Sequence, residues 1–355
     1  MEKFIDFGPE MVTSDSLEFI VQRFFNPDDT PETDPVGAGN INDTFRVAFE
    51  QAGKTHSWLL QRLNHQVFTD PEAVMHNIRL VAAHLSRQPD FPLAVPAPLP
   101  GLDGRLLQRD AAGNYWRVFP FFENTYAPEQ LPDAAVAFEA ASAYGRFLGA
   151  LRDCSAENIR ETIPGFHDTD RRWEQFLATV REDPAGRVIG VSAEIKLLHD
   201  LKPVFDEVSS LKQSGALPLR VVHNDTKAGN VLLDTATGKA VAVIDWDTIM
   251  PGTVLSDFGD MVRSFTPDVV EDVAGPVHLR KEILDALTHG FLETTEDFLT
   301  DTERRHLLLG ARWIIGEQAL RFLTDYLAGD RYYKIRYPEH NLVRARNQLA
   351  LFAEL

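Results

Sequence analysis

The sequence predicts an α+β protein of two unequal lobes, a small N-terminal lobe rich in β-structure and a larger, mainly helical C-terminal lobe. Two observations lead to this prediction. Short β-like runs dominate the first 125 of the 355 residues, whereas apolar residues at helical spacing dominate after Asp133. The length also corresponds to about two domains of ordinary size. We therefore expect lobes at residues 1–125 and 126–355.

The composition is that of a globular protein with an acidic surface. Hydrophobic residues make up 44% and charged residues 25%. The 35 Lys and Arg against 53 Asp and Glu give a net charge of −18, opposite in sign to most proteins that bind nucleic acid or anionic membranes. The single cysteine, Cys154, excludes an intramolecular disulfide. With no signal-like start and no apolar run of about 18 residues, we expect a cytoplasmic protein that binds neither nucleic acid nor membrane.

The first lobe is predicted to contain two hairpins and a helix between them. Polar and apolar residues alternate over 44–49, and a second β-like run at 57–63 follows a turn. Helical spacing continues over 71–86, with Asp70 as the expected N-cap. The other expected elements are a helix at 17–25, a loop at 26–35 and a second hairpin at 105–109 and 115–121.

The second lobe is predicted to be helical around one compact β region. Apolar residues repeat at helical spacing over 136–151, 279–298 and 304–327. Between the first two of these, residues 219–247 contain short apolar runs typical of strands. The polar residues inside this β region carry the strongest chemical signal in the chain.

The first polar cluster combines a His-x-Asp triplet with a downstream asparagine. His223 and Asp225 belong to the triplet, and Asn230 follows five residues after the aspartate, with apolar runs on both sides. A second apolar run, 241–244, ends in Asp245. Either feature alone is usually a hydrogen-bonded turn or a cap, and His223 is expected to be scaffold. The two features in this order nevertheless favour catalysis.

These residue types supply what phosphoryl transfer from a nucleotide requires. Asp225 can orient and deprotonate an acceptor hydroxyl, and Lys227 can neutralise charge on the transferring group. Asn230 and Asp245 offer the oxygen ligands that Mg²⁺ prefers, and Mg²⁺ takes few of its ligands from protein. The sequence therefore predicts a magnesium-dependent phosphotransferase that uses a nucleoside triphosphate.

A competing metal ligand is suggested by the triplet Asp257-Phe258-Gly259. The triplet matches the metal motif of protein kinases. However, Asp257 lies 27 residues after Asn230, whereas Asp245 lies 15 residues after it at a strand end. We therefore assign the metal to Asp245 and expect Asp257 to be a helix N-cap that also braces the catalytic loop.

A candidate phosphate loop precedes the first predicted strand. Gly37 and Gly39 lie in the segment 37–44, and residues without a Cβ let backbone amides approach a phosphate. A Gly-x-Gly pair by itself is as often an ordinary turn. The segment gains weight as a nucleotide contact only from the catalytic loop further along the chain.

These motifs resemble those of the aminoglycoside phosphotransferase and choline kinase superfamily. The resemblance implies a protein-kinase-like two-lobed fold, with a nucleotide-binding lobe at 1–125, a catalytic and acceptor-binding lobe at 126–355, and ATP and Mg²⁺ as cofactors. More narrowly, the chain resembles the kinases that make N-acetylhexosamine 1-phosphates, which implies a small sugar as substrate. The matching stretches are 39–42, 60–64, 116–118 with Glu123, 166–169, 223–230, 245–252 and 337–344.

The resemblance also implies roles for individual residues. It makes Asp225 the catalytic base and a substrate contact, and it makes Asn230 and Asp245 the Mg²⁺ ligands. It places Arg321 and Tyr332 at the sugar. The nucleotide contacts that it implies are Gly37, Gly39, Asn42, Gln61 and Glu123.

Two positions depart from the family pattern. Gln61 stands near the place of the lysine on the third strand of kinases, so its usual ion pair is absent or replaced by Arg62. Asn40, an implied substrate contact in the glycine loop, stands where a histidine is expected. The second departure affects the identity of the acceptor more than the type of reaction.

Other acceptors stay open. An aminoglycoside kinase needs an acidic site for a polycation, whereas residues 312–346 hold seven basic and four acidic residues, which favours a neutral sugar. Several of these cations can instead pair with acids elsewhere. Choline and homoserine kinases are further alternatives. A nucleotide-binding module without turnover is another, which the intact Asp225, Asn230 and Asp245 disfavour.

Overall fold

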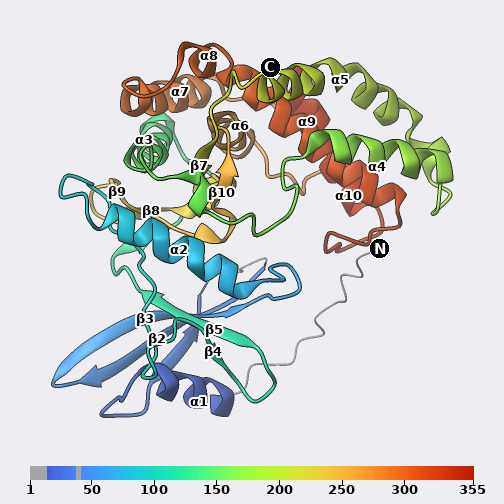
Figure 1. Ribbon diagram of the computed structural model, residues 1–355. Helices are drawn as coiled ribbons and strands as arrows, with labels where there is room; N and C mark the ends of the chain where they lie inside the picture. The colour runs from blue at the N-terminus through green and yellow to red at the C-terminus, as the bar shows by residue number, and fades with distance from the viewer. Residues whose placement is uncertain (1–13, 37–40) are drawn as a thin grey trace.

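The N-terminal part of the chain is built on an antiparallel sheet. The computed structural model describes residues 14–36 and 41–355. Five strands lie in the order β1-β2-β3-β5-β4, and each is antiparallel to its neighbours (Figure 1). The strands are Glu32–Pro35 (β1), Asp43–Gln51 (β2), Lys54–Leu63 (β3), Gln108–Arg109 (β4) and Tyr115–Pro120 (β5).

One helix covers a face of this sheet. α1 (Ser14–Phe24) buries Ile20 and Val21 against Leu60 and Trp116 of the strands. The predicted helix and both predicted hairpins are confirmed. The loop predicted at 26–35 is wrong at its end, because 32–35 pairs with β2 as an edge strand. Backbone pairing with β2 recruits this Pro- and Asp-containing segment, since an edge strand tolerates proline.

A second helix lies between the N-terminal sheet and the rest of the chain (Figure 1). α2 (Pro71–Leu85) begins as predicted, because the Asp70 side chain accepts a hydrogen bond from the Ala73 amide at 3.0 Å. The Asn77 side chain of α2 donates to the backbone oxygen of Ile249 at 3.0 Å. α2 therefore links the sheet to the segment that follows the predicted metal ligand.

Two small sheets frame the polar clusters of the second part. β7 (Arg220–Val222) pairs with β10 (Met250–Gly252). A second sheet has the order β6-β8-β9, with β6 at Thr125–Tyr126, β8 at Val231–Asp234 and β9 at Ala240–Val243. The predicted β region is confirmed. The predicted boundary between 1–125 and 126–355 falls inside β6, which pairs with β8 of the second part. The division into these two lobes stays a proposal.

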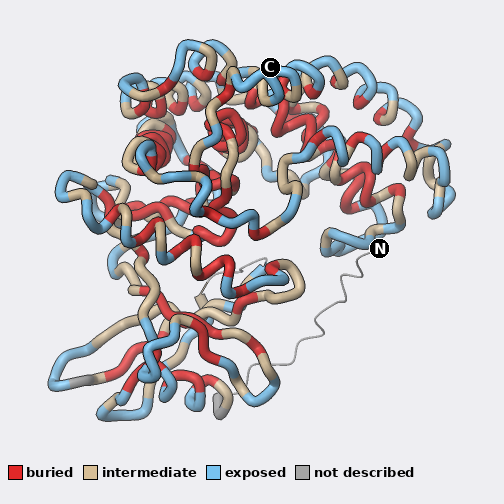
Figure 2. The backbone as a smooth tube through the Cα atoms, viewed as in Figure 1, coloured by how far each residue is buried: buried red, intermediate tan, exposed pale blue. Residues whose placement is uncertain are grey.

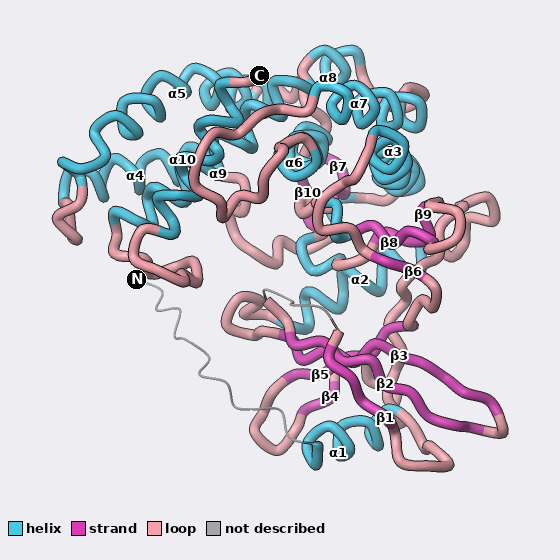
Figure 3. Tube along the Cα trace, turned by 180° about the vertical axis from the view of Figure 1, so that it is seen from behind, coloured by secondary structure: helices cyan, strands magenta, loops and turns pink. Residues whose placement is uncertain are grey.

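Helices form the remainder of the second part, opposite the N-terminal sheet (Figure 3). α3 packs against α7, and α9 packs against α6 and α10, so the predicted helical lobe and the α+β class are confirmed. No helix within residues 14–36 and 41–355 combines the length and apolarity needed to cross a membrane. The helices are α3 (Ala134–Ala150), α4 (Thr169–Glu182), α5 (Ser192–Gln213), α6 (Val254–Phe265), α7 (Lys281–Thr295), α8 (Asp301–Arg305), α9 (Leu307–Leu327) and α10 (His340–Ala353).

Buried segments are concentrated along α3, α6 and α9 (Figure 2). Where α6 meets α9, a Cβ on Gly259 would lie 2.3 Å from the backbone oxygen of Gly310, so the two helices touch backbone to backbone. Phe258, the preceding residue, is fully buried. Two residues of the Asp-Phe-Gly triplet therefore serve helix packing.

Candidate active site

The loop between β7 and β8 holds the predicted catalytic groups against one another. Lys227 Nζ donates to Asp225 Oδ2 at 2.8 Å. The Asn230 side-chain amide donates to the same oxygen at 2.9 Å and to the Asp225 backbone oxygen at 2.8 Å. The side chains of Asp225 and Lys227 are 27% and 42% exposed. The groups are thus fixed by one another and still accessible to a ligand.

Asp245 joins this group from the end of β9. The amide of the preceding residue, Ile244, donates to the backbone oxygen of Asn230 at 2.9 Å. Lys227 Nζ lies 3.8 Å from Asp245 Oδ2 and so stands between the two carboxylates. Asp245 has a φ of 62°, a left-handed conformation that costs free energy in a residue other than glycine. The structure brings together all four residues predicted for catalysis and metal binding.

The two carboxylates differ in how readily they ionise. Burial, together with the neighbouring carboxylate of Asp247, raises the pKa of Asp245 to about 6. Although 39% of the Asp245 side chain is exposed, the surrounding protein limits its solvation. Burial also opposes ionisation of Asp225, but the charge and hydrogen bond of Lys227 hold the pKa of Asp225 below its usual value. Asp225 is therefore an ionised carboxylate at neutral pH.

The donor set fits a magnesium ion. The amide nitrogen of Asn230 is fixed on Asp225, which leaves the amide oxygen of Asn230 for another partner. The raised pKa of Asp245 marks a carboxylate with too little positive charge around it. No cluster of three or more His, Cys, Asp and Glu side chains suited to a metal occurs among the described residues. An amide and a carboxylate nevertheless suit Mg²⁺, which prefers few protein oxygens.

A buried carboxylate braces the catalytic loop from behind. The two oxygens of Asp257 accept hydrogen bonds from the amides of His223, at 2.9 Å, and Asn224, at 2.7 Å. Burial raises the pKa of Asp257 to about 6. The expected contact with the loop is present, but the expected cap is wrong: Thr253 is the N-cap of α6, and Asp257 lies within its first turn.

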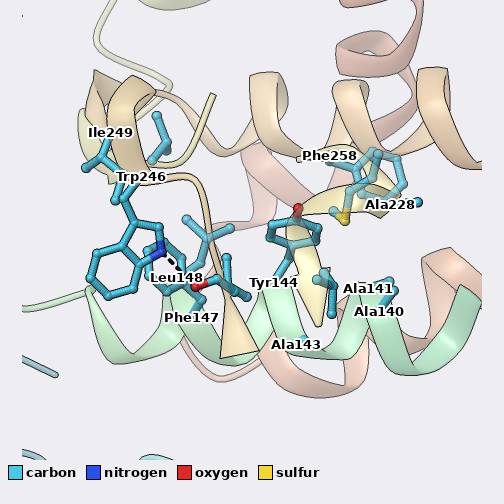
Figure 4. Packing of buried hydrophobic residues seen from close by; sticks show 14 of the residues in the cluster. Ala140, Ala141, Ala143, Tyr144, Phe147, Leu148, Ala228, Trp246, Ile249 and Phe258 are labelled. Atoms are coloured by element: carbon cyan, nitrogen blue, oxygen red, sulfur yellow. Dashed lines mark hydrogen bonds between the residues drawn. The ribbon is translucent and has the colours of Figure 1, made fainter. Parts of the chain in front are cut away.

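His223 is scaffold, as expected. Its Nε2 lies 2.9 Å from the backbone oxygen of Ile244, which ties the loop to the residue before Asp245. Its ring packs against Tyr144 and Phe147 of α3. Figure 4 shows those two side chains, with the ring of Trp246 beside Phe147. His223 is fully buried, so it positions the loop from inside the core.

The cation that faces this site from the N-terminal sheet is Arg117 of β5. Arg117 lies across from Gln61 in the β3–β5 register, and its Nε and Nη2 donate to Gln61 Oε1 at 3.1 and 2.9 Å. Its guanidinium also binds Asp247. Arg62 pairs with the exposed Asp43, and its replacement of the kinase lysine stays a prediction. Sequence reasoning missed Arg117, whose signal is a charge inside a buried apolar strand.

The other implied nucleotide contacts differ in whether they touch Asp247, the partner of Arg117. The Asn42 side chain donates to Asp247 Oδ2 at 2.8 Å and accepts from the Asn64 amide at 3.0 Å. Glu123 follows β5 and pairs with Arg46 at 3.3 Å, with 55% of its side chain exposed. Gly37, Gly39 and Asn40 lie outside the described residues. Asn42 thus reaches the segment that follows Asp245, whereas Glu123 lies between β5 and β6.

Arg321 and Tyr332 lie together in the helical part. The Arg321 guanidinium lies 5.6 Å from the ring of Phe166, 6.0 Å from that of Tyr332 and 5.7 Å from that of Tyr333. Tyr332 is 44% exposed. The cluster therefore presents one guanidinium among aromatic rings, with Tyr332 at the surface.

A buried carboxylate supports this cluster. Glu317 lies one turn before Arg321 on α9 and accepts hydrogen bonds from His167 Nδ1, at 2.8 Å, and from the Thr169 hydroxyl. Burial opposes its ionisation, but the charges of His167 and Arg172 outweigh this and lower the pKa of Glu317 to about 2. Glu317 was not identified from the sequence, where it is an isolated acid in a helix.

The basic excess of residues 312–346 is in part taken up by ion pairs. Asp272 pairs with Arg344 at 2.6 Å and with Arg336 at 3.6 Å. Arg346 pairs with Glu194 at 2.6 Å. Both acids lie outside the segment. Three of the seven cations of the segment are therefore paired with acids elsewhere in the protein. The charge count of the segment is accordingly a weak argument about the acceptor.

A cavity of about 480 Å³ lies beside the catalytic loop and reaches it at Asn224 rather than at Asp225. Three acids line it, and each accepts a local hydrogen bond: Glu161 from the Gly165 amide, Asp168 from the Arg171 amide and Asp170 from the Ser209 hydroxyl. The aromatic and basic side chains that also line it include Phe166, His167, Lys212 and Trp313.

Comparisons with known proteins show the family and the fold of this chain. Residues 32–293 match the model of the APH phosphotransferase enzyme family. Three solved structures share the fold at low identity. A spectinomycin phosphotransferase in complex with ADP and spectinomycin has 14% identity and a TM-score of 0.60, over 96% of this chain and 98% of its own. The choline kinase of Cryptosporidium parvum Iowa II has 14% and 0.56, over 97% and 96%. A microcompartment-associated aminopropanol kinase has 18% and 0.58, over 95% and 94%.

The two lobes and the catalytic loop therefore define a kinase-like fold of the aminoglycoside phosphotransferase and choline kinase type. The family match covers well over half of the chain, and the chain belongs to the phosphotransferase enzyme family. Membership of this family makes the chain a phosphotransferase.

Proposed function

We propose that the protein transfers a phosphoryl group from ATP to the anomeric hydroxyl of an N-acetylhexosamine and releases the sugar 1-phosphate. N-acetylglucosamine and N-acetylgalactosamine are the proposed substrates. The observation that carries the proposal is the contact of Asp225 with both Lys227 and Asn230, beside Asp245. These are the base, the cation and the metal ligands that phosphoryl transfer requires.

Asp225 is the proposed base. Its pKa is held below the usual value, so it is ionised and able to accept the proton of the acceptor hydroxyl. Lys227 holds the carboxylate in place and carries positive charge toward the transferring group. Asn230 and Asp245 would hold Mg²⁺, which when bound supplies positive charge against the phosphate oxygens. Gly37, Gly39, Asn42, Gln61 and Glu123 are the proposed nucleotide contacts or their supports.

The proposed acceptor contacts are Arg321 and Tyr332, with Asn40. A guanidinium among aromatic rings offers hydrogen-bond donors and flat apolar faces, which suit the hydroxyls and ring of a neutral sugar. The acids of the neighbouring cavity are each engaged in local hydrogen bonds, which gives less support to a polycationic acceptor. The narrower resemblance of residues 245–252 and 337–344 points to the same acceptor.

A panel of acceptors tests the proposal. The full chain is incubated with ATP and Mg²⁺ and with N-acetylglucosamine, N-acetylgalactosamine, glucose, choline or spectinomycin, and the products are examined by ³¹P NMR. We expect an anomeric phosphate from one or both N-acetylhexosamines and much slower transfer to the amines. Preferential phosphorylation of choline or spectinomycin would overturn the acceptor assignment. Binding of ATP with neither hydrolysis nor transfer to any acceptor would favour a nucleotide-binding module.

A further inference from the structure

Asp247 is the point where the N-terminal sheet meets the metal-binding segment. Arg117 Nη1 donates to Asp247 Oδ1 at 2.6 Å, and Nη2 donates to Oδ2 at 2.8 Å. Asn42 donates to Oδ2 as well, at 2.8 Å. The side chains of Arg117 and Asp247 are only 2% and 3% exposed. One buried carboxylate thus receives three hydrogen bonds from two separate segments of the first lobe.

The guanidinium of Arg117 is fully committed to protein. Besides Asp247, it donates to Gln61 Oε1, and its Nη1 lies 3.8 Å from the sulfur of Met75 on α2. In protein kinases a third-strand lysine pairs with a glutamate of the following helix. Here the third strand offers Gln61 and the following helix offers Met75. A buried charged pair of this chain instead joins Arg117 of β5 to Asp247, two residues after Asp245.

The backbone between Asp247 and Asp245 is short and anchored. Trp246 is buried, and its indole Nε1 donates to the backbone oxygen of Val243 at 2.9 Å. Residues 246–248 form a single 3₁₀ turn directly after Asp245. Asp245 itself has a left-handed φ, which persists only where its surroundings fix it. A displacement of the Asp247 carboxylate should therefore also displace Asp245.

We propose that Arg117 is a positioning residue that acts through Asp247 to orient Asp245 for the metal–nucleotide and to hold the N-terminal sheet against it. The inference rests on the proposed function, since it takes Asp245 as a metal ligand. Without Arg117, Asp247 becomes an uncompensated buried carboxylate two residues from Asp245. It then repels the Asp245 carboxylate or competes with it for a cation.

A second buried pair supplies a matched control. Arg220 donates to Glu303 through Nε at 2.7 Å and through Nη2 at 2.9 Å, and Glu303 is fully buried. This pair joins β7 to α8 and touches neither Gln61 nor Asp247. Arg220→Met and Arg117→Met therefore remove the same kind of interaction, but only the second lies next to the metal segment.

The test measures binding of ADP as Mg²⁺ is titrated, by calorimetry on the full chain, together with the melting temperature. We expect Arg117→Met to weaken Mg²⁺-dependent ADP binding about 10–100-fold, the usual loss when a support of a metal ligand is removed. Arg117→Lys should recover part of this loss, since an ammonium restores the charge without the bidentate geometry. Adding Asp247→Asn to Arg117→Met should also recover part, because it removes the unpaired carboxylate. Arg220→Met should lower only the melting temperature.

Each outcome separates the possibilities. A wild-type protein that fails to bind ADP in a Mg²⁺-dependent manner defeats the proposed function before Arg117 is considered. If the wild type binds and Arg117→Met binds equally well at every Mg²⁺ concentration, Arg117 is structural only and the inference is wrong. If Arg117→Met does not fold, Arg117→Lys carries the test, and wild-type affinity in that variant contradicts the inference.

Discussion

Two clusters of charged side chains in this protein are arranged in opposite ways. At the catalytic loop, the side chains of Asp225, Lys227 and Asp245 are 27%, 42% and 39% exposed, and the pKa of Asp245 is raised to about 6. On α9, Glu317 is 2% exposed, and its partners lower its pKa to about 2. The first cluster leaves the Asp245 carboxylate short of positive charge, whereas the second neutralises the Glu317 carboxylate within the protein.

We take this difference to distinguish the proposed ligand-binding site, at the catalytic loop, from a cluster on α9 that stabilises the fold. A carboxylate whose pKa is raised destabilises the folded protein when ionised and is relieved when a cation arrives. A carboxylate whose pKa is lowered already has its partners and stabilises the fold. Substitutions in the two clusters should accordingly change different measurements, activity in the first and stability in the second.

The largest effect is expected for Asp225→Asn. The size of the side chain stays the same, but the acceptor for the hydroxyl proton is lost, so turnover should fall by about 10²–10⁴-fold. The fold should be kept, with some loss of melting temperature because the ion pair with Lys227 is lost. Steady-state rates and thermal melts check both parts. Turnover within about tenfold of the wild type would remove Asp225 from the role of base.

Glu317→Gln should act in the opposite way, on stability. Removing one partner of a buried ion pair costs about 3–5 kcal/mol. Because the folded-state pKa of Glu317 lies below its ordinary value of 4.5, the ionised group stabilises the fold above about pH 4.5, and this contribution is lost as the pH falls toward about 2. Denaturant unfolding at pH 7 and pH 3 should therefore show a smaller difference between wild type and variant at pH 3. An equal difference at both pH values would contradict the assignment of the pair.

Asp257→Asn should reduce both stability and activity, each to a smaller extent than the substitution of Glu317 or of Asp225. The amide group of asparagine can accept only one of the two backbone hydrogen bonds and directs its own N–H at the other amide, so the variant should lose about 1–3 kcal/mol. Activity should be reduced but still respond to Mg²⁺. If instead this variant loses its Mg²⁺ response, the metal ligand is Asp257 and the assignment to Asp245 is wrong.

The smallest effect is expected for Arg62→Gln. The side chain of Asp43, its ion-pair partner, is 53% exposed and that of Arg62 is 14% exposed, and a pair with one partner in water contributes about 1 kcal/mol or less. The KM for ATP should stay within about twofold of the wild type by the same argument. A large rise in that KM would contradict this expectation and would make Arg62 a nucleotide contact.

Short-range features of this protein could be predicted from its sequence. The Asp70 cap, the hairpin at β2 and β3, and the loop from His223 to Asn230 all depend on residues within a few positions of one another. The spacing of Asp225, Lys227 and Asn230 therefore already implied their contact. The resemblance to the superfamily then supplied the fold as a whole.

Contacts between distant segments could not be predicted in this way. Arg117 and Asp247 are 130 residues apart, and no motif around either residue indicates that the two form a pair. β1 becomes a strand only because β2 pairs with it. The Asp257 carboxylate does not cap α6, because it accepts hydrogen bonds from two amides of the catalytic loop. In each case the tertiary partner decides, and the local sequence is neutral.

The most direct test of the account is Asp245→Asn, examined for stability and nucleotide binding in the same protein preparation. If Asp245 is a carboxylate held for a metal, the ligand-free variant should melt at the wild-type temperature or slightly above it, because an unfavourable charge is gone. Stabilisation by ADP with Mg²⁺ should disappear, and phosphoryl transfer should stop. A variant that melts several degrees lower, yet is stabilised by ADP and Mg²⁺ as strongly as the wild type, would contradict the assignment of the metal site.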